Sequence, residues 1–410
     1  MNDSLGLVYT YLNKDTNLPD WPNGIERDDN TGFESMVYSF GYSIDHFLKL
    51  GIQTGVFSLT NTEKYIYPIE TSNVQFWRVK KDSKLFIPDQ VVQDTINGKA
   101  KIMFINSAEG DGFADDSNPM NCTKHKIKLI KNQSLFYNIP LSRFIYVDSN
   151  YLAPTILNKE GIQGEYLSFW QHTLFYRNII TPIVSDIKEA ILNKKHRPKK
   201  AICLNRKPVA HRAWMVNRLL ELDMIKDNIV TFPERFTTDL SNCYESKLEK
   251  LKERMPLIHD QNNILNPTAD ITQPDPTLQT EATFNIITET YFDHDSTRMF
   301  YSEKVFKSIV CLQPFVIVGQ PYYLKYLRDM GYKTFEGFID ESYDSIIDSK
   351  VRLDKIIEVI KYIQSLSSQQ LTDLLYSMYP ILEHNYNTHE QIVSSNYNCV
   401  VLAHSILNNW

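Results

Sequence analysis

A chain of 410 residues is too long for one small hydrophobic core, and its length predicts two domains. Hydrophobic residues make up 42% of it and charged residues 22%, as in an ordinary globular protein. The net charge of −6 argues against a protein that binds nucleic acid or anionic lipid non-specifically.

Cysteine usage and hydropathy indicate the compartment in which such a protein acts. The five cysteines include no CxxC pair, so they indicate neither a zinc ribbon nor a disulfide framework. Residues 1–13 lack the basic and apolar regions of a signal peptide, and the most apolar window, 308–319, is too short to span a bilayer. We therefore expect a soluble, cytoplasmic protein without a membrane span.

The first half of the chain has the pattern of mixed α and β structure. Short apolar runs predict strands at residues 6–12, 102–106 and 143–147. The apolar face of residues 163–194 predicts a largely helical segment. Together these elements predict an N-terminal α/β domain over residues 1–193.

A basic run at residues 194–200 follows this domain. We interpret it as the connection between two domains. The alternative is a positive rim of a cleft that faces phosphate, and the residues leave both readings open.

The second domain begins with a strand predicted at residues 201–204, followed by an amphipathic helix at 212–225 and a strand at 229–232. Strand, loop, helix and strand in this order form the opening of a parallel βαβ unit. We expect this domain to extend to residue 370. The helices predicted over 371–410 are expected to pack back towards the first domain.

The loop between that strand and helix carries polar and cationic side chains. It comes at the carboxyl end of a predicted parallel strand, where open α/β sheets bind ligands. Arginine donates to phosphate through a planar fork, so several cations at this edge suit a diphosphate. A surface turn with solvated charges is the alternative. The candidate residues of this loop are Asn205, Arg206, His211 and Arg212.

A second polar segment leads into a helix at Ser302. Serine is a favourable N-cap, and Glu303 and Lys304 fall in the first helical turn. The carboxylate suits ribose hydroxyls, while the ammonium and the free backbone N–H groups suit a diphosphate. This arrangement predicts a nucleotide-activated substrate. Further along, Ser367 and Gln370 are spaced as a capping box for a C-terminal helix.

The segments LNRKPVAHR and ITETYFDHDSTRMFYSEKVFKSIVCLQPFVIVG together carry a family resemblance. Residues 201–344 resemble the donor-binding domain of fucosyltransferase-like and exostosin-like glycosyltransferases, including bacteriophage-encoded ones. The resemblance implies an α/β, GT-B-like fold: two Rossmann-like domains with a cleft between them. Arg212 matches the family's diphosphate-binding arginine.

The family's Glu-Lys pair matches Glu303 and Lys304, which implies contacts to ribose and phosphate. Its Glu-Asn segment is matched in part by Glu289 and Thr290. The complete predicted donor site is Asn205, Arg206, His211, Arg212, Glu289, Thr290, Ser302, Glu303, Lys304 and Lys307.

The resemblance implies a hexosyl- or pentosyltransferase that moves sugar from a nucleoside diphosphate sugar to an acceptor hydroxyl. Such enzymes generally use no metal, so we expect no cofactor beyond the donor. We expect an inverting reaction, with either a glycan or a hydroxymethylated base in phage DNA as acceptor. For a phage-encoded enzyme the compartment would be the host cytoplasm.

An inverting enzyme needs a general base for the acceptor hydroxyl. The glycine-rich loop SAEGDG follows the strand predicted at 102–106 and carries two carboxylates. We predict Glu109 as the base, with Asp111 as the second candidate. A turn with exposed acids explains the same pattern, and the family resemblance does not reach this loop.

Two alternatives belong to other classes. A non-catalytic protein that binds nucleotide sugar or glycan would retain the donor site without transfer. A metal-dependent GT-A-type transferase would use the carboxylates of Asp293 and Asp295, since hard cations prefer carboxylate oxygen.

Overall fold

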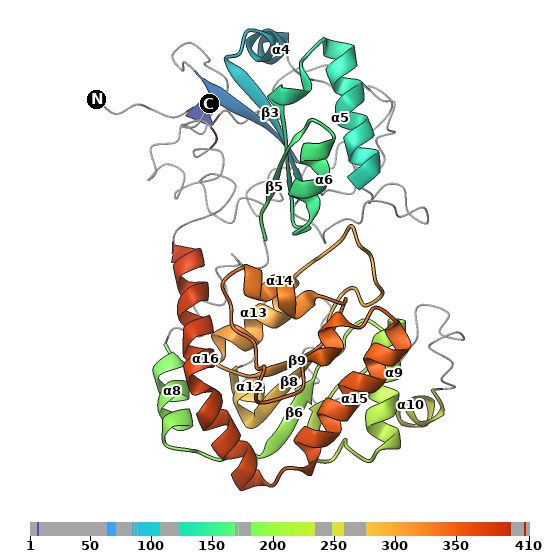
Figure 1. The fold of residues 1–410 in the computed structure, drawn as a ribbon, viewed down its shortest axis with the longest axis vertical. Coiled ribbons are helices and arrows are strands. Elements are labelled where there is room, and N and C mark those ends of the chain that lie inside the picture. Colours follow the sequence, from blue (N-terminus) through green and yellow to red (C-terminus); the bar gives the residue numbers. More distant parts are fainter. Residues whose placement is uncertain are drawn as a thin grey trace, which may run out of the picture. The chain divides into compact units, whose positions relative to one another are not determined.

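The computed structural model describes residues 6–7, 64–70, 84–85, 87, 89–106, 123–168, 171, 182–233, 248–257, 276–394 and 406. These residues fall into two compact units (Figure 1). The first contains the described residues up to 171 together with 295–300, 394 and 406, and the second contains the remainder.

The first unit is built on a parallel sheet in the order β1-β2-β3-β4-β5. Every residue of β4 and all but one of β3 are buried, as expected for central strands of a parallel sheet that is covered on both faces. The strands are β1 Gly6–Leu7, β2 Tyr65–Glu70, β3 Ala100–Asn106, β4 Phe144–Asp148 and β5 Gln163–Tyr166. The helices are α4 Asp89–Ile96, α5 Thr123–Tyr137 and α6 Ala153–Lys159, and a 3-10 turn spans Leu141–Arg143.

Strand β5 corrects the prediction of a largely helical segment at 163–194. The segment begins with a strand that pairs with β4, and its described helix is α8, Val184–Leu192. Gly164 allows β5 to lie close to α6. A Cβ at this position would lie 2.7 Å from the Leu157 Cβ and 2.8 Å from the Pro154 Cα, so α6 packs directly on the strand's backbone.

The second unit has a parallel sheet in the order β7-β6-β8-β9. In Figure 1, α8 and α16 lie to one side of this sheet and α9, α10 and α15 to the other. The strands are β6 Lys199–Cys203, β7 Asn228–Val230, β8 Ala282–Thr288 and β9 Phe315–Val318. Besides α8, the helices are α9 Ala210–Glu221, α10 Glu249–Arg254, α12 Pro276–Glu281, α13 Glu303–Val310, α14 Tyr323–Asp329, α15 Ser349–Ser365 and α16 Ser368–Ser394, with a 3-10 turn at Ser342–Ser345.

The predicted fold class, α/β with two Rossmann-like units, is confirmed by these two parallel sheets. The local predictions for the second unit also agree with the structure. Strands lie where apolar runs predicted them at 201–204 and 229–232, and α9 covers most of the helix predicted at 212–225. Among the described residues, no helix combines the length and apolarity needed to cross a membrane.

The basic run differs from its interpretation as a connection, because residues 194–200 lie inside the second unit. Lys200 belongs to β6, and its Nζ donates to the carbonyl of Leu366 (3.0 Å) after α15. Lys194 pairs with Asp373 on α16 at 2.7 Å. These lysines hold the start of β6 to the turn between α15 and α16. Of the C-terminal helices, α16 up to residue 393 also belongs to this unit, while 394 and 406 fall in the first.

The predicted capping box at the start of α16 is confirmed. The Ser367 Oγ accepts from the Gln370 N–H (3.2 Å), and the Gln370 Oε1 accepts from the Ser367 N–H (2.9 Å).

Ser367→Ala should therefore lower the free energy of unfolding by about 1 kcal/mol in urea titrations. Ser377→Ala, in the interior of the same helix, is the matched control. Its hydroxyl bonds only back to Asp373 O, so its loss should leave stability unchanged or slightly raised. Equal losses in both variants would contradict the capping role.

Candidate functional site

Two neighbouring strands of the second sheet, β6 and β8, lead into polar segments at their carboxyl ends. The strand order reverses between them: β7 follows β6 on one side, and β8 and β9 lie on the other. Open α/β sheets bind ligands at this kind of position. Asn205 follows β6, and Thr288 ends β8; the Thr288 hydroxyl donates to the Asn205 Oδ1 at 2.7 Å. The buried Asn205 amide also donates to the Thr231 carbonyl after β7 (3.1 Å), so it fixes three strand ends to one another.

The backbone of Glu289, directly after β8, contacts the first turn of α9. The Glu289 carbonyl accepts from the His211 Nε2 at 2.8 Å and from the Arg212 Nη2 at 3.1 Å. The structure thus brings together the two segments on which the sequence placed the donor site, although 77 and 78 residues separate them.

The Glu289 side chain contacts the helices on the other side. Its Oε2 accepts from the Ser302 hydroxyl (2.6 Å) and the Thr290 N–H (3.1 Å), and its Oε1 accepts from the Tyr323 hydroxyl (2.7 Å). The residue is 1% exposed, and a buried carboxylate needs such donors. The starts of α9, α13 and α14 therefore meet at Glu289. Three protein donors to its carboxylate make Glu289 a structural centre of the site.

The predicted N-cap at Ser302 is confirmed. Its Oγ accepts from the Lys304 N–H and from the Lys304 Nζ, each at 3.3 Å. The Lys304 ammonium also pairs with the Glu303 Oε1 at 3.1 Å. Burial raises the pKa of Glu303, but the Lys304 and Lys307 charges outweigh burial and hold this pKa below its usual value. Glu303 is therefore an ionised acceptor at the start of the helix, and Lys307 contributes through its charge.

His211 is a neutral side chain in this site. Burial, followed by the charge of Arg212, lowers the pKa of His211 to about 3. Its ring stacks on Phe292 with centroids 5.3 Å apart. Since a carbonyl can only accept, Nε2 carries the proton and Nδ1 is left as an acceptor. His211 is therefore not one of the cations expected at this edge. Arg212 and Lys304 supply the positive charge around Glu289.

No protein-family model matches the chain, and no curated protein sequence does. The solved structures that are similar to it include the following two. An α,α-trehalose-phosphate synthase (UDP-forming) from Burkholderia vietnamiensis shares 8% identity with a TM-score of 0.39, over 82% of this chain and 75% of that one. The Glycosylation Associate Protein (Gap123) complex from Streptococcus agalactiae shares 9% identity with a TM-score of 0.32, over 83% of this chain and 56% of that one.

Sequence reasoning missed three residues that shape the site. Tyr323 follows β9, which neighbours β8, so its place at the same sheet edge was a usable signal. Arg352, on α15, is buried; its Nη2 donates to the Phe292 carbonyl (2.5 Å) and its guanidinium lies 4.2 Å from the centre of the Phe292 ring. Phe292 in turn supports His211. Nothing in the local sequence signals the contact between Arg352 and Phe292, because it depends on how α15 packs.

The carboxylates of the Asp293-His294-Asp295 motif contact separate partners. The Asp293 Oδ1 accepts from the Ser349 hydroxyl (2.7 Å) at the start of α15, within the second unit. The Asp295 Oδ1 accepts from the Thr297 N–H (2.9 Å), within the first. In the part of the chain that the structure describes, no three His, Cys, Asp or Glu side chains are grouped to hold a metal ion. The predicted bases, Glu109 and Asp111, lie outside the described residues.

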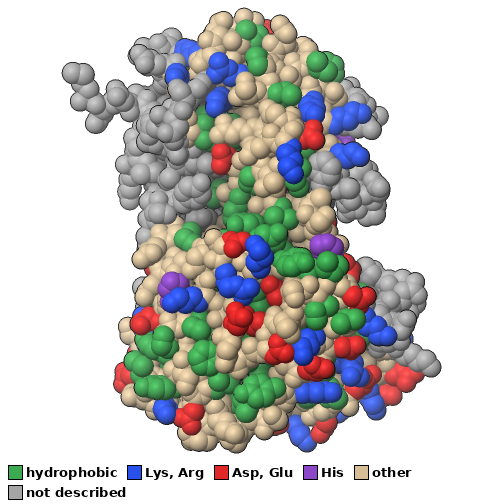
Figure 2. All heavy atoms as spheres, in the orientation of Figure 1, with side chains coloured by type: hydrophobic (Ala, Val, Ile, Leu, Met, Phe, Trp, Pro, Cys, Tyr) green, Lys and Arg blue, Asp and Glu red, His purple; other side chains and the backbone are tan. Residues whose placement is uncertain are grey.

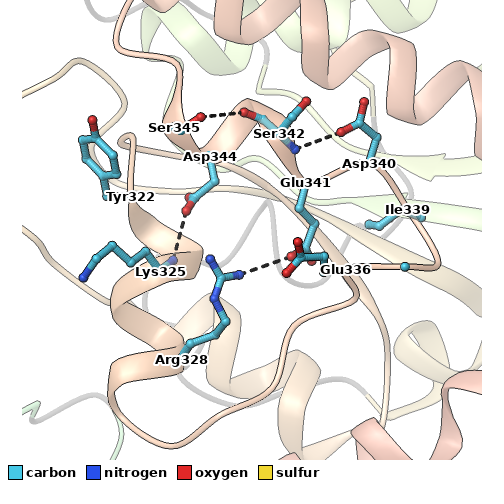
Figure 3. A pocket seen from close by; sticks show the side chains of 11 residues that line it. Tyr322, Lys325, Arg328, Glu336, Ile339, Asp340, Glu341, Ser342, Asp344 and Ser345 are labelled. Atoms are coloured by element: carbon cyan, nitrogen blue, oxygen red, sulfur yellow. Dashed lines mark hydrogen bonds and ion pairs between the residues drawn. The ribbon is translucent and has the colours of Figure 1, made fainter.

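A cavity of about 540 Å³ lies beside α14 (Figure 3). In its wall, Asp344 accepts from the Leu324 and Lys325 N–H groups (2.8 and 3.0 Å), and Arg328 pairs with Glu341 (3.4 Å). None of the side chains gathered at Glu289 lines it. Its residues fix the start of α14, the helix that presents Tyr323 to Glu289.

Proposed function

We propose that this protein is a glycosyltransferase that moves a sugar from a nucleoside diphosphate sugar to an acceptor hydroxyl, with inversion and without a metal. One observation carries the proposal: the starts of α9 and α13 meet at Glu289, with Arg212 on one and Lys304 on the other. Both cations also lower the pKa of His211, which places both charges near one ring.

This arrangement suits a departing diphosphate. Negative charge collects on the diphosphate as the sugar leaves, and fixed cations and helix N-termini stabilise charge that develops in the transition state. Val209, the N-cap of α9, makes no side-chain cap hydrogen bond, and the N-terminus of a helix favours an anion. The ionised Glu303 beside Lys304 is suited to accept hydrogen bonds from ribose hydroxyls. Arg206, half-buried in the loop before α9, would add positive charge at the edge.

The acceptor belongs to the same proposal. Its hydroxyl proton would pass to Glu109, or to Asp111, and the acceptor would be a glycan or a hydroxymethylated base in phage DNA. On the face drawn in Figure 2, acidic and basic side chains are interspersed over the second unit. A gel shift with hydroxymethylated duplex DNA across a salt series separates these two acceptors, because binding to DNA phosphates weakens steeply with salt.

Nucleoside diphosphates should stabilise the protein against unfolding. A ligand that binds only the folded state raises the free energy of unfolding by about 2.7 kcal/mol at a concentration 100 times its Kd. We expect a thermal-shift screen of UDP, GDP, CDP and dTDP to show one preferred base, with the same shift whether or not Mn²⁺ is present. The free nucleosides serve as controls and should shift the melting temperature less. A melting temperature that none of the four diphosphates moves would rule the proposal out.

A further inference from the structure

We propose that Tyr323 and Glu289 are positioning residues that set the direction of the Lys304 ammonium through Ser302. The inference rests on the proposed function, since it takes the phosphates of a nucleoside diphosphate as the group that Lys304 meets. It concerns the hydrogen bonds that connect Tyr323, Glu289, Ser302 and Lys304.

In this series of hydrogen bonds, the direction of each bond follows from which group carries the hydrogen. The hydroxyls of Tyr323 and Ser302 both donate to carboxylate oxygens of Glu289, at 2.7 and 2.6 Å. A serine hydroxyl has one hydrogen. With that hydrogen held by Glu289, the Ser302 oxygen is left to accept, and it accepts from the Lys304 N–H and Nζ. Glu289 therefore makes Ser302 an acceptor that is aimed at Lys304.

Burial fixes every side chain of this hydrogen-bond series except that of Lys304. Tyr323, Glu289 and Ser302 are each 1% exposed, whereas the Lys304 side chain is 25% exposed. Tyr323 is itself held by Tyr301, whose ring centroid lies 4.5 Å away and whose hydroxyl donates to the Tyr323 carbonyl (2.9 Å). The ammonium thus stands at the accessible end of a fixed series of contacts. Its other partner, Glu303, lies 3.1 Å away.

Breaking this series of hydrogen bonds should weaken the binding of phosphate and not that of the nucleoside. If Tyr323 no longer donates to Glu289, the carboxylate shifts, Ser302 loses its fixed hydrogen, and Lys304 is held by Glu303 alone. A hydrogen bond to a charged group has an effect of roughly tenfold or more on an equilibrium constant. Glu303, which is proposed to meet the ribose, keeps its pair with Lys304, so the binding of the nucleoside should change little.

The test is isothermal titration of Tyr323→Phe with the diphosphate preferred in the screen and with its nucleoside. We expect the Kd of the diphosphate to rise about tenfold and that of the nucleoside to change less than twofold. Tyr332→Phe is the matched control, because it removes a buried hydroxyl of the same unit that bonds to His389 and not to Glu289 or Tyr323. Its affinities should stay within twofold of those of the wild type.

Ser302→Ala interrupts the chain one step nearer Lys304 and should show the same selective loss, which keeps the test informative should Tyr323→Phe fold poorly. Wild-type affinity for the diphosphate in either variant, or an equal loss for diphosphate and nucleoside, would overturn the inference while leaving the proposed function standing. A wild-type protein that binds no diphosphate would instead overturn the proposed function, and the inference with it.

Discussion

Lys304→Ala should lower kcat/KM for sugar transfer by 10²–10³-fold while the protein stays folded. Removing one preorganised donor from developing negative charge typically has an effect of this size. The Lys304 ammonium is partly exposed and contacts Ser302 and Glu303, and after its loss the Glu303 carboxylate keeps the nearby charge of Lys307. Release of diphosphate from the preferred nucleotide sugar, followed with and without acceptor, measures the change.

The control for this variant is Lys226→Ala. Lys226 lies in the same unit and pairs with Asp223 on the surface, where ion pairs contribute little to stability. Its rate should stay within twofold of the wild type. A Lys304→Ala enzyme that turns over as fast as the wild type would show that the ammonium does not meet the leaving group, and the proposed transferase chemistry would lose its main cation.

Local signals were sufficient for the parts of the site that depend on neighbours in the sequence. A serine before an acidic residue predicted the start of α13, and apolar runs predicted β6 and β7. The donor site predicted from both segments also required Arg212 and Ser302 to approach each other, and both contact Glu289.

Tertiary packing decided the rest. Whether Glu289 faces a ligand or other protein groups depends on Tyr323, which reaches it from α14 only after β9 has joined the sheet. The basic run was placed between domains on composition, yet Lys200 is a strand residue whose ammonium caps the carboxyl end of α15. In both cases the deciding partner is more than 30 residues away, where a pattern in one sequence carries no signal.

The protonation state of His211 depends on burial in the same way, and it gives the protein an acid-sensitive element. Its folded pKa of about 3 lies below the ordinary value of 6.5, because burial, Arg212, Lys304 and Arg352 disfavour its charge and the hydrogen bond to Glu289 only partly compensates. A depressed pKa contributes stability above pH 6.5 that is lost as the pH falls towards 3, since the unfolded chain then binds a proton that the folded protein does not. Between pH 7 and pH 5 the loss from this residue should be about 2 kcal/mol.

His211→Gln separates this effect from the general acid sensitivity of the carboxylates, which both proteins share. The glutamine amide can donate to the Glu289 carbonyl as Nε2 does, but it does not titrate. The variant should be less stable at pH 7, because it loses the stacking on Phe292. Its free energy of unfolding should nevertheless fall by about 2 kcal/mol less than that of the wild type from pH 7 to pH 5. Parallel urea unfolding curves at the two pH values measure this difference, and equal losses would mean that His211 is accessible to protons in the folded protein.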